Sequence, residues 1–163
     1  MTIAHRIEDY MMQYGVQYDV VTHPHSRSST ETAELAQVPG DRLAKSVVLQ
    51  DEEGYLMAVL PSTRHVRLGR LSRELSRRFR LATEEEIGAL FEGCERGAIP
   101  PLGSAYGLDT IIDDSLTEQP EIYFEAGDHE RLIRVSREQF MRLMEQAGHG
   151  HFGHHGRFMT YRA

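Results

Sequence analysis

Apolar residues recur at two spacings along the chain, and the alternation of these spacings divides it into helices and strands. Ile3, Ile7 and Met11 recur at four-residue intervals and Gly15 follows, which predicts an amphipathic helix over residues 2–14. Other helices are predicted by capping patterns and by leucine spacing: Ser28 with Glu31, Leu68 with Leu71 and Leu75, Thr83 with Glu86, and Ser136 with Gln139.

Short apolar runs bounded by turn residues predict the strands. They are residues 16–22, 46–50, 55–61, 110–113, 121–125 and 131–136. The acidic turn 51–54 joins the second and third of these runs, so we expect a hairpin of two largely buried strands there. Strand pairs joined by short turns and mixed with separate helices predict an α+β fold with a mixed, mainly antiparallel sheet flanked by helices.

Length and composition predict a single domain. The chain has 163 residues, of which 40% are hydrophobic and 26% are charged, as is typical of a globular protein with one core. We expect the domain to span residues 1–147 and a His- and Gly-rich tail, residues 148–163, to follow it. The longest apolar run, residues 55–60, is far shorter than the roughly 18–20 residues that cross a membrane, and the N-terminus does not resemble a signal peptide. These patterns predict a cytoplasmic protein, which the single cysteine fits.

Lys45 stands out among the charged residues because it is the one lysine among 18 Lys and Arg positions. A lysine ammonium is compact and sits on a flexible stem, unlike the planar guanidinium of arginine. Lys45 directly precedes the apolar run 46–50, so its stem can lie along a strand end while the ammonium opens into a cleft. We therefore predict a role for Lys45 in a functional site, the alternative being that one lysine survived by chance.

The loop 97–103, GAIPPLG, is the second candidate. Glycine permits close approach of the backbone to a ligand, and Pro100 and Pro101 stiffen the loop. The N–H groups of its other residues could hold a carbonyl or a developing oxyanion, although an ordinary connecting turn has the same composition. His129 lies in a turn between two predicted strands, where its ring could bond a ligand or a neighbouring backbone carbonyl.

Several other kinds of site are disfavoured by spacing. The chain has no phosphate-binding glycine loop, dinucleotide fingerprint, nucleophile elbow or HExxH motif. Cys94 could act as a nucleophile with His129, but an isolated cysteine is usually a buried apolar residue. The tail histidines could bind a metal ion, but no Cys or carboxylate cluster lies near them, and the intervening glycines predict a flexible segment. These histidines are His149, His151, His154 and His155. We therefore expect no metal and no organic cofactor.

The order of these motifs resembles that of the YbaK/prolyl-tRNA synthetase-associated domain family of aminoacyl-tRNA deacylases. The shared features are Lys45 in AKSVVL, the run YLMAVLP, the loop GAIPPLG, the strand TIIDD and the turn GDHE, within residues 20–146. Members are α+β domains, freestanding or inserted in prolyl-tRNA synthetases, that hydrolyse the ester of mischarged tRNA. An aminoacyl ester is already activated, so this reaction needs a positioned water or substrate hydroxyl and charge stabilisation rather than a side-chain nucleophile.

The resemblance implies roles for individual residues. Lys45 matches the lysine that engages the terminal adenosine of the tRNA, and Gly97 and Pro101 match the GxxxP loop that contacts the aminoacyl group. Ser46 stands where members that edit alanine commonly have asparagine, which leaves the amino acid open. The implied catalytic residues are Lys45 and Gly97, and the implied substrate-binding residues are Ser46, Ala98, Ile99, Pro100, Pro101, Gly103 and His129.

The net charge of −7 opposes RNA binding, but basic residues cluster locally. Arg70, Arg73 and Arg77 are spaced to share one helix face, where they could contact tRNA phosphates, although a solvated helix surface has the same pattern. We expect a trans-editing deacylase that binds the acceptor end of mischarged tRNA, with an aminoacyl-tRNA synthetase as a further candidate partner and with neither membrane nor DNA. The alternatives are a non-catalytic module that binds a small ligand, a tRNA end or a protein through the same pocket, and a metal-binding protein organised by the tail histidines.

Overall fold

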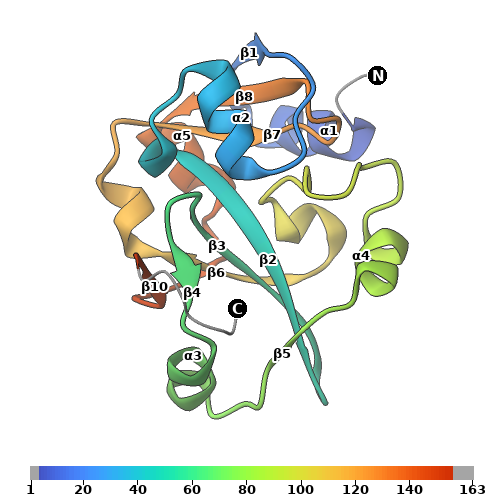
Figure 1. Ribbon diagram of the computed structural model, residues 1–163, viewed down its shortest axis with the longest axis vertical. Coiled ribbons are helices and arrows are strands. Elements are labelled where there is room, and N and C mark those ends of the chain that lie inside the picture. The colour runs from blue at the N-terminus through green and yellow to red at the C-terminus, as the bar shows by residue number, and fades with distance from the viewer. Residues whose placement is uncertain (1–3, 156–163) are drawn as a thin grey trace.

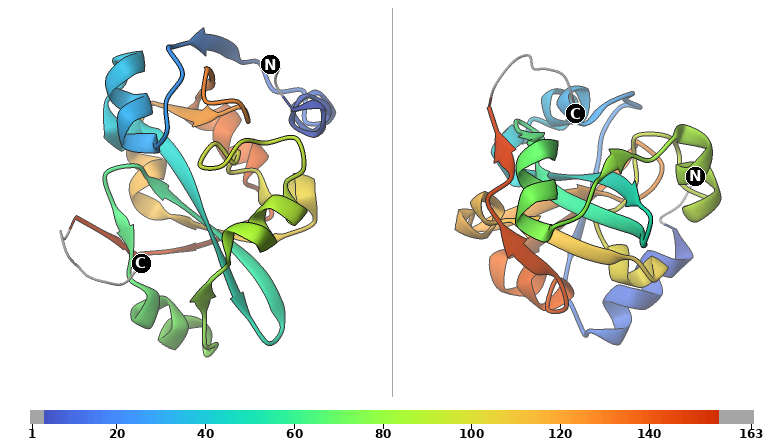
Figure 2. Two further views of the ribbon diagram at one scale, coloured as in Figure 1. Left: turned by 45° about the vertical axis from the view of Figure 1, so that its right-hand side comes forward. Right: turned by 90° about the horizontal axis from the view of Figure 1, so that it is seen from below.

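A mixed sheet forms the centre of the domain in the computed structural model, which describes residues 4–155, and helices lie against both faces of the sheet (Figure 1; Figure 2). The helices are α1 (His5–Gln13), α2 (Ser29–Ala36), α3 (Leu68–Leu75), α4 (Glu84–Leu90) and α5 (Arg137–Leu143). The strands are β1 (Asp19–Thr22), β2 (Leu43–Asp51), β3 (Gly54–Pro61), β4 (His65–Val66), β5 (Arg80–Leu81), β6 (Asp109–Asp113), β7 (Glu121–Glu125), β8 (Arg131–Ser136), β9 (Gly148–Gly150) and β10 (Gly153–His154).

Strand β2 lies in the middle of the large sheet, whose strand order is β1-β8-β7-β2-β3-β6-β9. One edge of β2 pairs antiparallel with β3 along its length, which is the hairpin that the sequence predicts. The other edge pairs in parallel with β7 through Leu43 and Ala44, and antiparallel with β5 through Leu49 and Gln50. Between these pairings, residues 45–47 face no other described strand on that edge, so the sheet has an open edge there.

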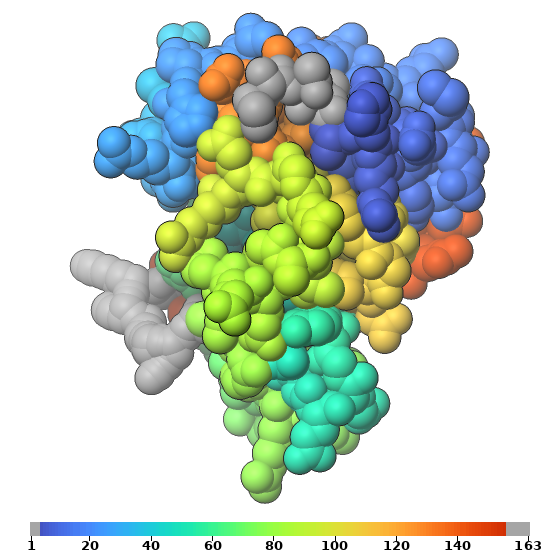
Figure 3. Space-filling view, turned by 90° about the vertical axis from the view of Figure 1, so that its right-hand side faces the viewer, coloured from blue at the N-terminus to red at the C-terminus, as the bar shows by residue number. Residues whose placement is uncertain are grey.

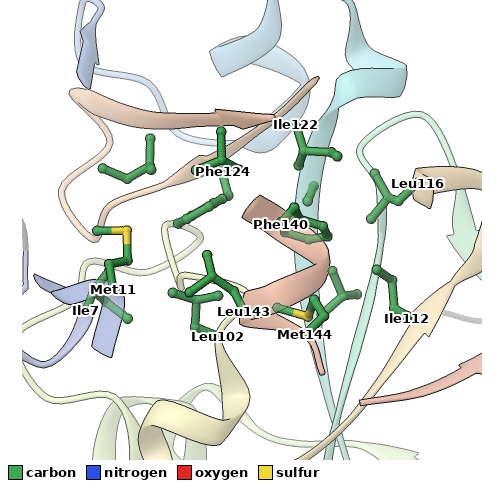
Figure 4. Close-up of a cluster of buried hydrophobic side chains, with 14 of the residues drawn as sticks. Ile7, Met11, Leu102, Ile112, Leu116, Ile122, Phe124, Phe140, Leu143 and Met144 are labelled. Atoms are coloured by element: carbon green, nitrogen blue, oxygen red, sulfur yellow. The ribbon is translucent and has the colours of Figure 1, made fainter. Parts of the chain in front are cut away.

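The hairpin strands are covered on both faces. Successive side chains of a strand point to opposite sides, so the buried residues of the hairpin divide between two cores. Val48 and Met57 lie in the larger core, which also contains Phe140 of α5 (Figure 4). Leu49 and Leu60 lie in a second core on the other face, packed against α3. The continuous apolar run of β3 is therefore the sequence signature of a strand with two covered faces.

Capping side chains fix where three helices begin. Ser28, Thr83 and Ser136 each accept a hydrogen bond from a backbone N–H three residues further on, as their sequence patterns predict. Glu86 returns a bond to the backbone N–H of Thr83 at 2.8 Å, which completes a capping box. These bonds satisfy donors that a helix N-terminus otherwise leaves unpaired.

The C-terminal segment is part of the fold as far as the structure describes it. β9 pairs in parallel with β6, and β10 pairs antiparallel with β4. The N–H groups of Phe152 and Gly153 both donate to Oδ1 of the buried Asp113 at 2.8 Å, and the Phe152 side chain is fully buried. The prediction of a flexible segment was therefore wrong for residues 148–154, because a buried aromatic ring and a distant aspartate outweigh the Gly and His content. Residues 156–163 of the predicted tail lie outside the described residues.

The other differences from prediction concern the ends of two strands and the presence of two very short ones. β1 begins at Asp19 rather than at residue 16, and β2 begins at Leu43 rather than at residue 46. β4 and β5 were not predicted, because strands of two residues are too short to show an alternating pattern. No helix within residues 4–155 is long and apolar enough to cross a membrane.

Candidate functional site

Lys45 and Ser46 are neighbours on β2, but their side chains lie on opposite faces of the sheet. Lys45 pairs with Leu60 of the second core, whereas Ser46 pairs with Val59 of the larger core. The apolar run predicted that Lys45 lies just before the strand. β2 begins at Leu43, however, so Lys45 lies inside the strand. Both residues belong to the open edge of β2, so a ligand at this edge could reach groups on either face.

The Lys45 side chain lines a cavity of about 450 Å³. Thr30 and Glu34 of α2 form one wall, and Ser62 and His65 form another. Burial lowers the pKa of Lys45, and the ammonium has no ion-pair or hydrogen-bond partner among the described residues to offset this shift. A half-buried ammonium without a counter-ion is available to an anionic or oxygen-rich ligand.

Only part of the loop 97–103 is accessible on the surface shown in Figure 3, where the loop appears yellow-green. Gly97 is exposed and Ile99 is half-buried. The other loop residues predicted to bind substrate are buried, namely Ala98, Pro100, Pro101 and Gly103. Of the loop residues predicted to bind substrate, Gly97 and Ile99 are therefore the two that a ligand can reach.

The two glycines of the loop have different roles. Gly97 has a φ of 81°, which other residues rarely adopt, and a Cβ there would lie 3.1 Å from Nε2 of His129. A side chain at Gly97 would therefore press on His129 and not only on a bound ligand. A Cβ at Gly103 would overlap Oγ1 of Thr110, so Gly103 is required for packing.

Two side chains hold the carbonyl groups of this region from inside the protein. Ser46 Oγ donates to the carbonyl oxygen of Ile99 at 2.8 Å, and His129 Nε2 lies 2.5 Å from the carbonyl oxygen of Arg96. In contrast, the N–H groups of Gly97 and Ile99 donate to no other described residue, while Ala98 N–H donates to Glu95. The accessible loop residues thus offer hydrogen-bond donors, which suit a carbonyl oxygen or an anion.

His129 is only 2% exposed and has a left-handed backbone, with φ of 59°. Its Nε2 bonds a neighbouring backbone carbonyl, which is one of the two alternatives that its position in a turn left open. Its Nδ1 lies 3.3 Å from Ser26 Oγ and 3.6 Å from Oε2 of the buried Glu125. Thr32 Oγ1 lies 2.7 Å from the same Glu125 oxygen, within hydrogen-bond distance. Ser26, Thr32 and Glu125 were not predicted to belong to the site, although a carboxylate at the end of an apolar strand is a sign of a buried polar group that needs partners.

Comparison with protein families decides the identity of the domain. Residues 23–143 match the family model of the aminoacyl-tRNA editing domain. The chain belongs to the aminoacyl-tRNA editing domain family. This result confirms the resemblance that the order of the sequence motifs indicates. A search of curated proteins gave no match.

Solved structures show the same fold as this editing domain. A candidate trans-editing enzyme for prolyl tRNA synthetase superposes with a TM-score of 0.82 at 24% identity, covering 94% of this chain and 98% of that chain. A structure from work on epitope grafting onto scaffold proteins gives a TM-score of 0.81 at 21% identity, over 94% of this chain and 98% of that chain. A hypothetical protein gives 0.80 at 18% identity, over 92% of this chain and 100% of that chain. These similarities confirm the predicted α+β fold with its mixed, mainly antiparallel sheet.

The predicted arginine face of the editing domain is interrupted. α3 ends at Leu75, and Ser76 has a left-handed backbone with φ of 54°, so Arg77 lies beyond the helix. Nε and Nη2 of Arg77 each lie 2.6 Å from a carboxylate oxygen of Asp51, in the turn between β2 and β3. The prediction that Arg77 continues the helix face was wrong, because the helix ends earlier and an acidic turn distant in sequence binds its guanidinium.

The two exposed arginines of α3 remain on its surface. Arg70 pairs with Glu74 at 3.1 Å one turn along the helix, and Arg73 lies in the last turn. A surface ion pair of this kind is weak, so both guanidinium groups can reorient toward a phosphate.

Cys94 and two of the tail histidines have structural partners in the editing domain. Cys94 Sγ lies 3.6 Å from Oη of Tyr106, and burial raises the pKa of Cys94, which favours the unreactive thiol. His149 and His151 both contact the carboxylate of Asp114, at 2.8 and 3.4 Å. In residues 4–155, no group of three or more His, Cys, Asp or Glu side chains is placed to hold a metal ion.

Proposed function

We propose that this editing domain is a trans-editing aminoacyl-tRNA deacylase, which hydrolyses the ester bond of mischarged tRNA. The observation that carries the proposal is the open edge of β2, with Lys45 on one face and the donor-rich loop on the other. An ester at the end of a tRNA has a phosphate and a ribose on one side of the reacting carbonyl and an amino acid on the other. The two faces of the open edge match this division.

Lys45 would bind the nucleotide side of the substrate. Its ammonium is half-buried and has no competing partner among the described residues, so a phosphate or ribose oxygen of the terminal adenosine would not have to displace a carboxylate. The cavity beside it, of about 450 Å³, gives room for part of a nucleotide.

The loop would bind the reacting carbonyl. Water attacks the carbonyl carbon, negative charge develops on the carbonyl oxygen, and the bond from carbon to the ribose oxygen breaks while that oxygen gains a proton. The N–H groups of Gly97 and Ile99 would stabilise the developing charge, since they have no other acceptor among the described residues. Because Ser46 holds the carbonyl of Ile99 and His129 holds that of Arg96, the residue before the loop, the donors need little reorganisation during the reaction.

The side chains around the loop would set which amino acid is removed. The Ser46 hydroxyl is occupied by the carbonyl of Ile99, so we assign Ser46 to positioning the loop, and Ile99 is the loop side chain that can contact an amino acid. Ala98, Pro100, Pro101 and Gly103 would act through the shape of the loop, because they are buried. We further propose that the acceptor end of the tRNA contacts Arg70 and Arg73, and that a synthetase is a candidate partner.

A deacylation screen over mischarged tRNAs tests the proposal, with wild type and Lys45→Ala measured side by side under single-turnover conditions. We expect wild type to hydrolyse at least one ester and Lys45→Ala to be slower by about 100-fold or more, the size of effect seen when a preorganised charge or donor is removed. Thermal unfolding of both proteins controls for loss of fold. If wild type binds aminoacyl-tRNA and hydrolyses none of the esters, the domain is a non-catalytic binding module and the proposal is wrong.

A further inference from the structure

A chain of buried polar side chains leads from Glu125 to the loop. Thr32 Oγ1 lies 2.7 Å from Glu125 Oε2, Ser26 Oγ forms a hydrogen bond with Thr32 Oγ1, and His129 Nδ1 lies 3.3 Å from Ser26 Oγ. None of these four side chains belongs to a residue that is more than 4% exposed. At the far end, His129 Nε2 contacts the carbonyl oxygen of Arg96, the residue before Gly97.

The hydrogens along this chain can be counted. The Arg96 carbonyl can only accept, so Nε2 of His129 carries a hydrogen. Three contacts join Glu125, Thr32, Ser26 and His129, and each needs one hydrogen, of which the two hydroxyls supply two. The third must be a proton on Glu125 or on Nδ1 of His129. When it is on Glu125 all the hydrogens point toward His129, and when it is on His129 they all point toward Glu125.

We propose that Glu125, Thr32, Ser26 and His129 form a proton relay that holds one shared proton and moves it toward His129 when negative charge develops on a ligand at Gly97. Glu125 gives its proton to Thr32, each hydroxyl passes one hydrogen onward, and Nδ1 of His129 gains one, so no atom enters or leaves the chain. The imidazolium then stands behind the loop and strengthens the bond to Arg96. That the ligand is an ester carbonyl in hydrolysis rests on the proposed function, and the relay itself does not. His129 is in this view a positioning residue.

Charged groups around the relay bear on where its proton lies. Burial raises the pKa of Glu125, which favours the proton on Glu125 in the free protein. His23 Nε2 faces Glu125 Oε1 at 4.0 Å, and neither atom has a hydrogen-bond partner in the described part of the chain. Two other neighbours are already paired. Asp128 forms an ion pair with Arg131, and His25 bonds Glu95. The ring of His25 meets the ring of His129 edge-on.

Three substitutions separate the relay from simple packing. Glu125→Gln keeps the size of the side chain and an N–H that can donate to Thr32, but it cannot release a proton, so it holds Nδ1 of His129 as an acceptor. Thr32→Val removes the hydroxyl in the middle of the chain at nearly constant volume. Thr32→Ser retains the hydroxyl and is the matched control.

Imidazole ¹⁵N chemical shifts of the full-length protein at neutral pH, without substrate, test for the relay. In wild type and Thr32→Ser we expect the Nδ1 signal of His129 to lie close to the position of a bare nitrogen but displaced toward that of a hydrogen-bearing one, because the shared proton resides mainly on Glu125. In Glu125→Gln it should move to the bare position. A phosphonate analogue of 3′-aminoacyl-adenosine, whose charge imitates the developing oxyanion, should move the wild-type signal toward the hydrogen-bearing position, whereas a neutral amide analogue should not.

Single-turnover deacylation gives the second readout. We expect Glu125→Gln and Thr32→Val to lower the rate by about 10- to 100-fold at unchanged substrate affinity. Thr32→Ser should keep the wild-type rate. The relay is overturned, whatever the activity, if the Nδ1 signal is the same in wild type and Glu125→Gln, or if the phosphonate does not move it. This test uses Glu125→Gln, so it does not depend on whether Thr32→Val folds. If the signals behave as expected but wild type hydrolyses no ester, the relay stands and the proposed function is the part that fails.

Discussion

Lys45 is a basic residue of the β2–β3 hairpin and Arg77 is a basic residue bound to the turn of that hairpin, but their surroundings differ. Arg77 donates to both carboxylate oxygens of Asp51 and lies over the ring of Phe79. Lys45 has no ion-pair partner among the described residues and lines an open cavity. The hydrogen bond to Asp51 raises the pKa of Arg77, whereas burial lowers the pKa of Lys45. A paired charge supports the fold, and an unpaired half-buried charge costs folding free energy but remains available to a ligand.

The largest expected effect is on catalysis, and it concerns Lys45 alone. We expect Lys45→Arg to be as inactive as Lys45→Ala, because the planar guanidinium is wider than the compact ammonium and directs its N–H groups differently. Arg77→Lys should retain nearly full single-turnover activity. Deacylation rates at saturating enzyme measure both effects. Full activity of Lys45→Arg would show that positive charge alone suffices at position 45. Lys45 and Arg77 would then not differ in their tolerance of the other basic residue.

Stability should respond to the two residues with opposite signs. Replacing Lys45 by Met removes a half-buried charge that has no partner in the described part of the chain, so we expect the Tm to rise by a few degrees. Replacing Arg77 by Met leaves Asp51 without its guanidinium, so we expect the Tm to fall by a few degrees. Thermal unfolding of the two variants and wild type in one buffer measures this. A lower Tm for Lys45→Met would mean that the lysine stem or ammonium contributes to packing, and the comparison would fail.

The pH dependence of these differences should also be opposite. The hydrogen bond from Arg77 lowers the pKa of Asp51, so the stabilisation is present above the unfolded pKa of about 3.9 and is lost as the pH falls through the folded value. The difference in Tm between wild type and Arg77→Met should therefore shrink as the pH falls below about 4. The pKa of Lys45 is lowered, so its destabilising effect persists in acid and declines as the pH rises toward about 10.4. Unfolding series in acidic and alkaline buffers distinguish the two cases.

Local patterns were sufficient to predict most of the fold. Ser28, Thr83 and Ser136 form their caps with backbone groups three residues away, so the sequence alone contains both partners. The position of Phe152 could not be predicted in this way, because its burial depends on the aspartate at position 113 and on the pairing of β9 with β6. Interactions between residues distant in sequence are not visible in periodicity.

The candidate site shows the same limit. Lys45 was predicted from its rarity and the loop from its glycines and prolines, and both lie beside one open edge of β2. The relay joins residues of α2, of β7 and of two connecting segments, and neither spacing nor composition relates Thr32 to Glu125. The prediction that Arg77 lies on the α3 face failed for the same reason, since its partner Asp51 is 26 positions away.

The smallest expected effect concerns tRNA binding by the remaining arginines. Arg70 forms a surface ion pair with Glu74, and Arg73 is exposed, so each could contact one phosphate. Each phosphate contact contributes about 0.7–0.9 to the slope of log K against log salt, so changing both to Gln should reduce the slope by at most about 2. Arg77→Gln should leave the slope unchanged, because Asp51 already occupies its guanidinium. Binding of a non-hydrolysable aminoacyl-tRNA at several salt concentrations measures the slope. An Arg77 variant that loses as much slope as an Arg73 variant would show that pairing with Asp51 does not withhold the charge, and that Arg77 resembles Lys45 after all.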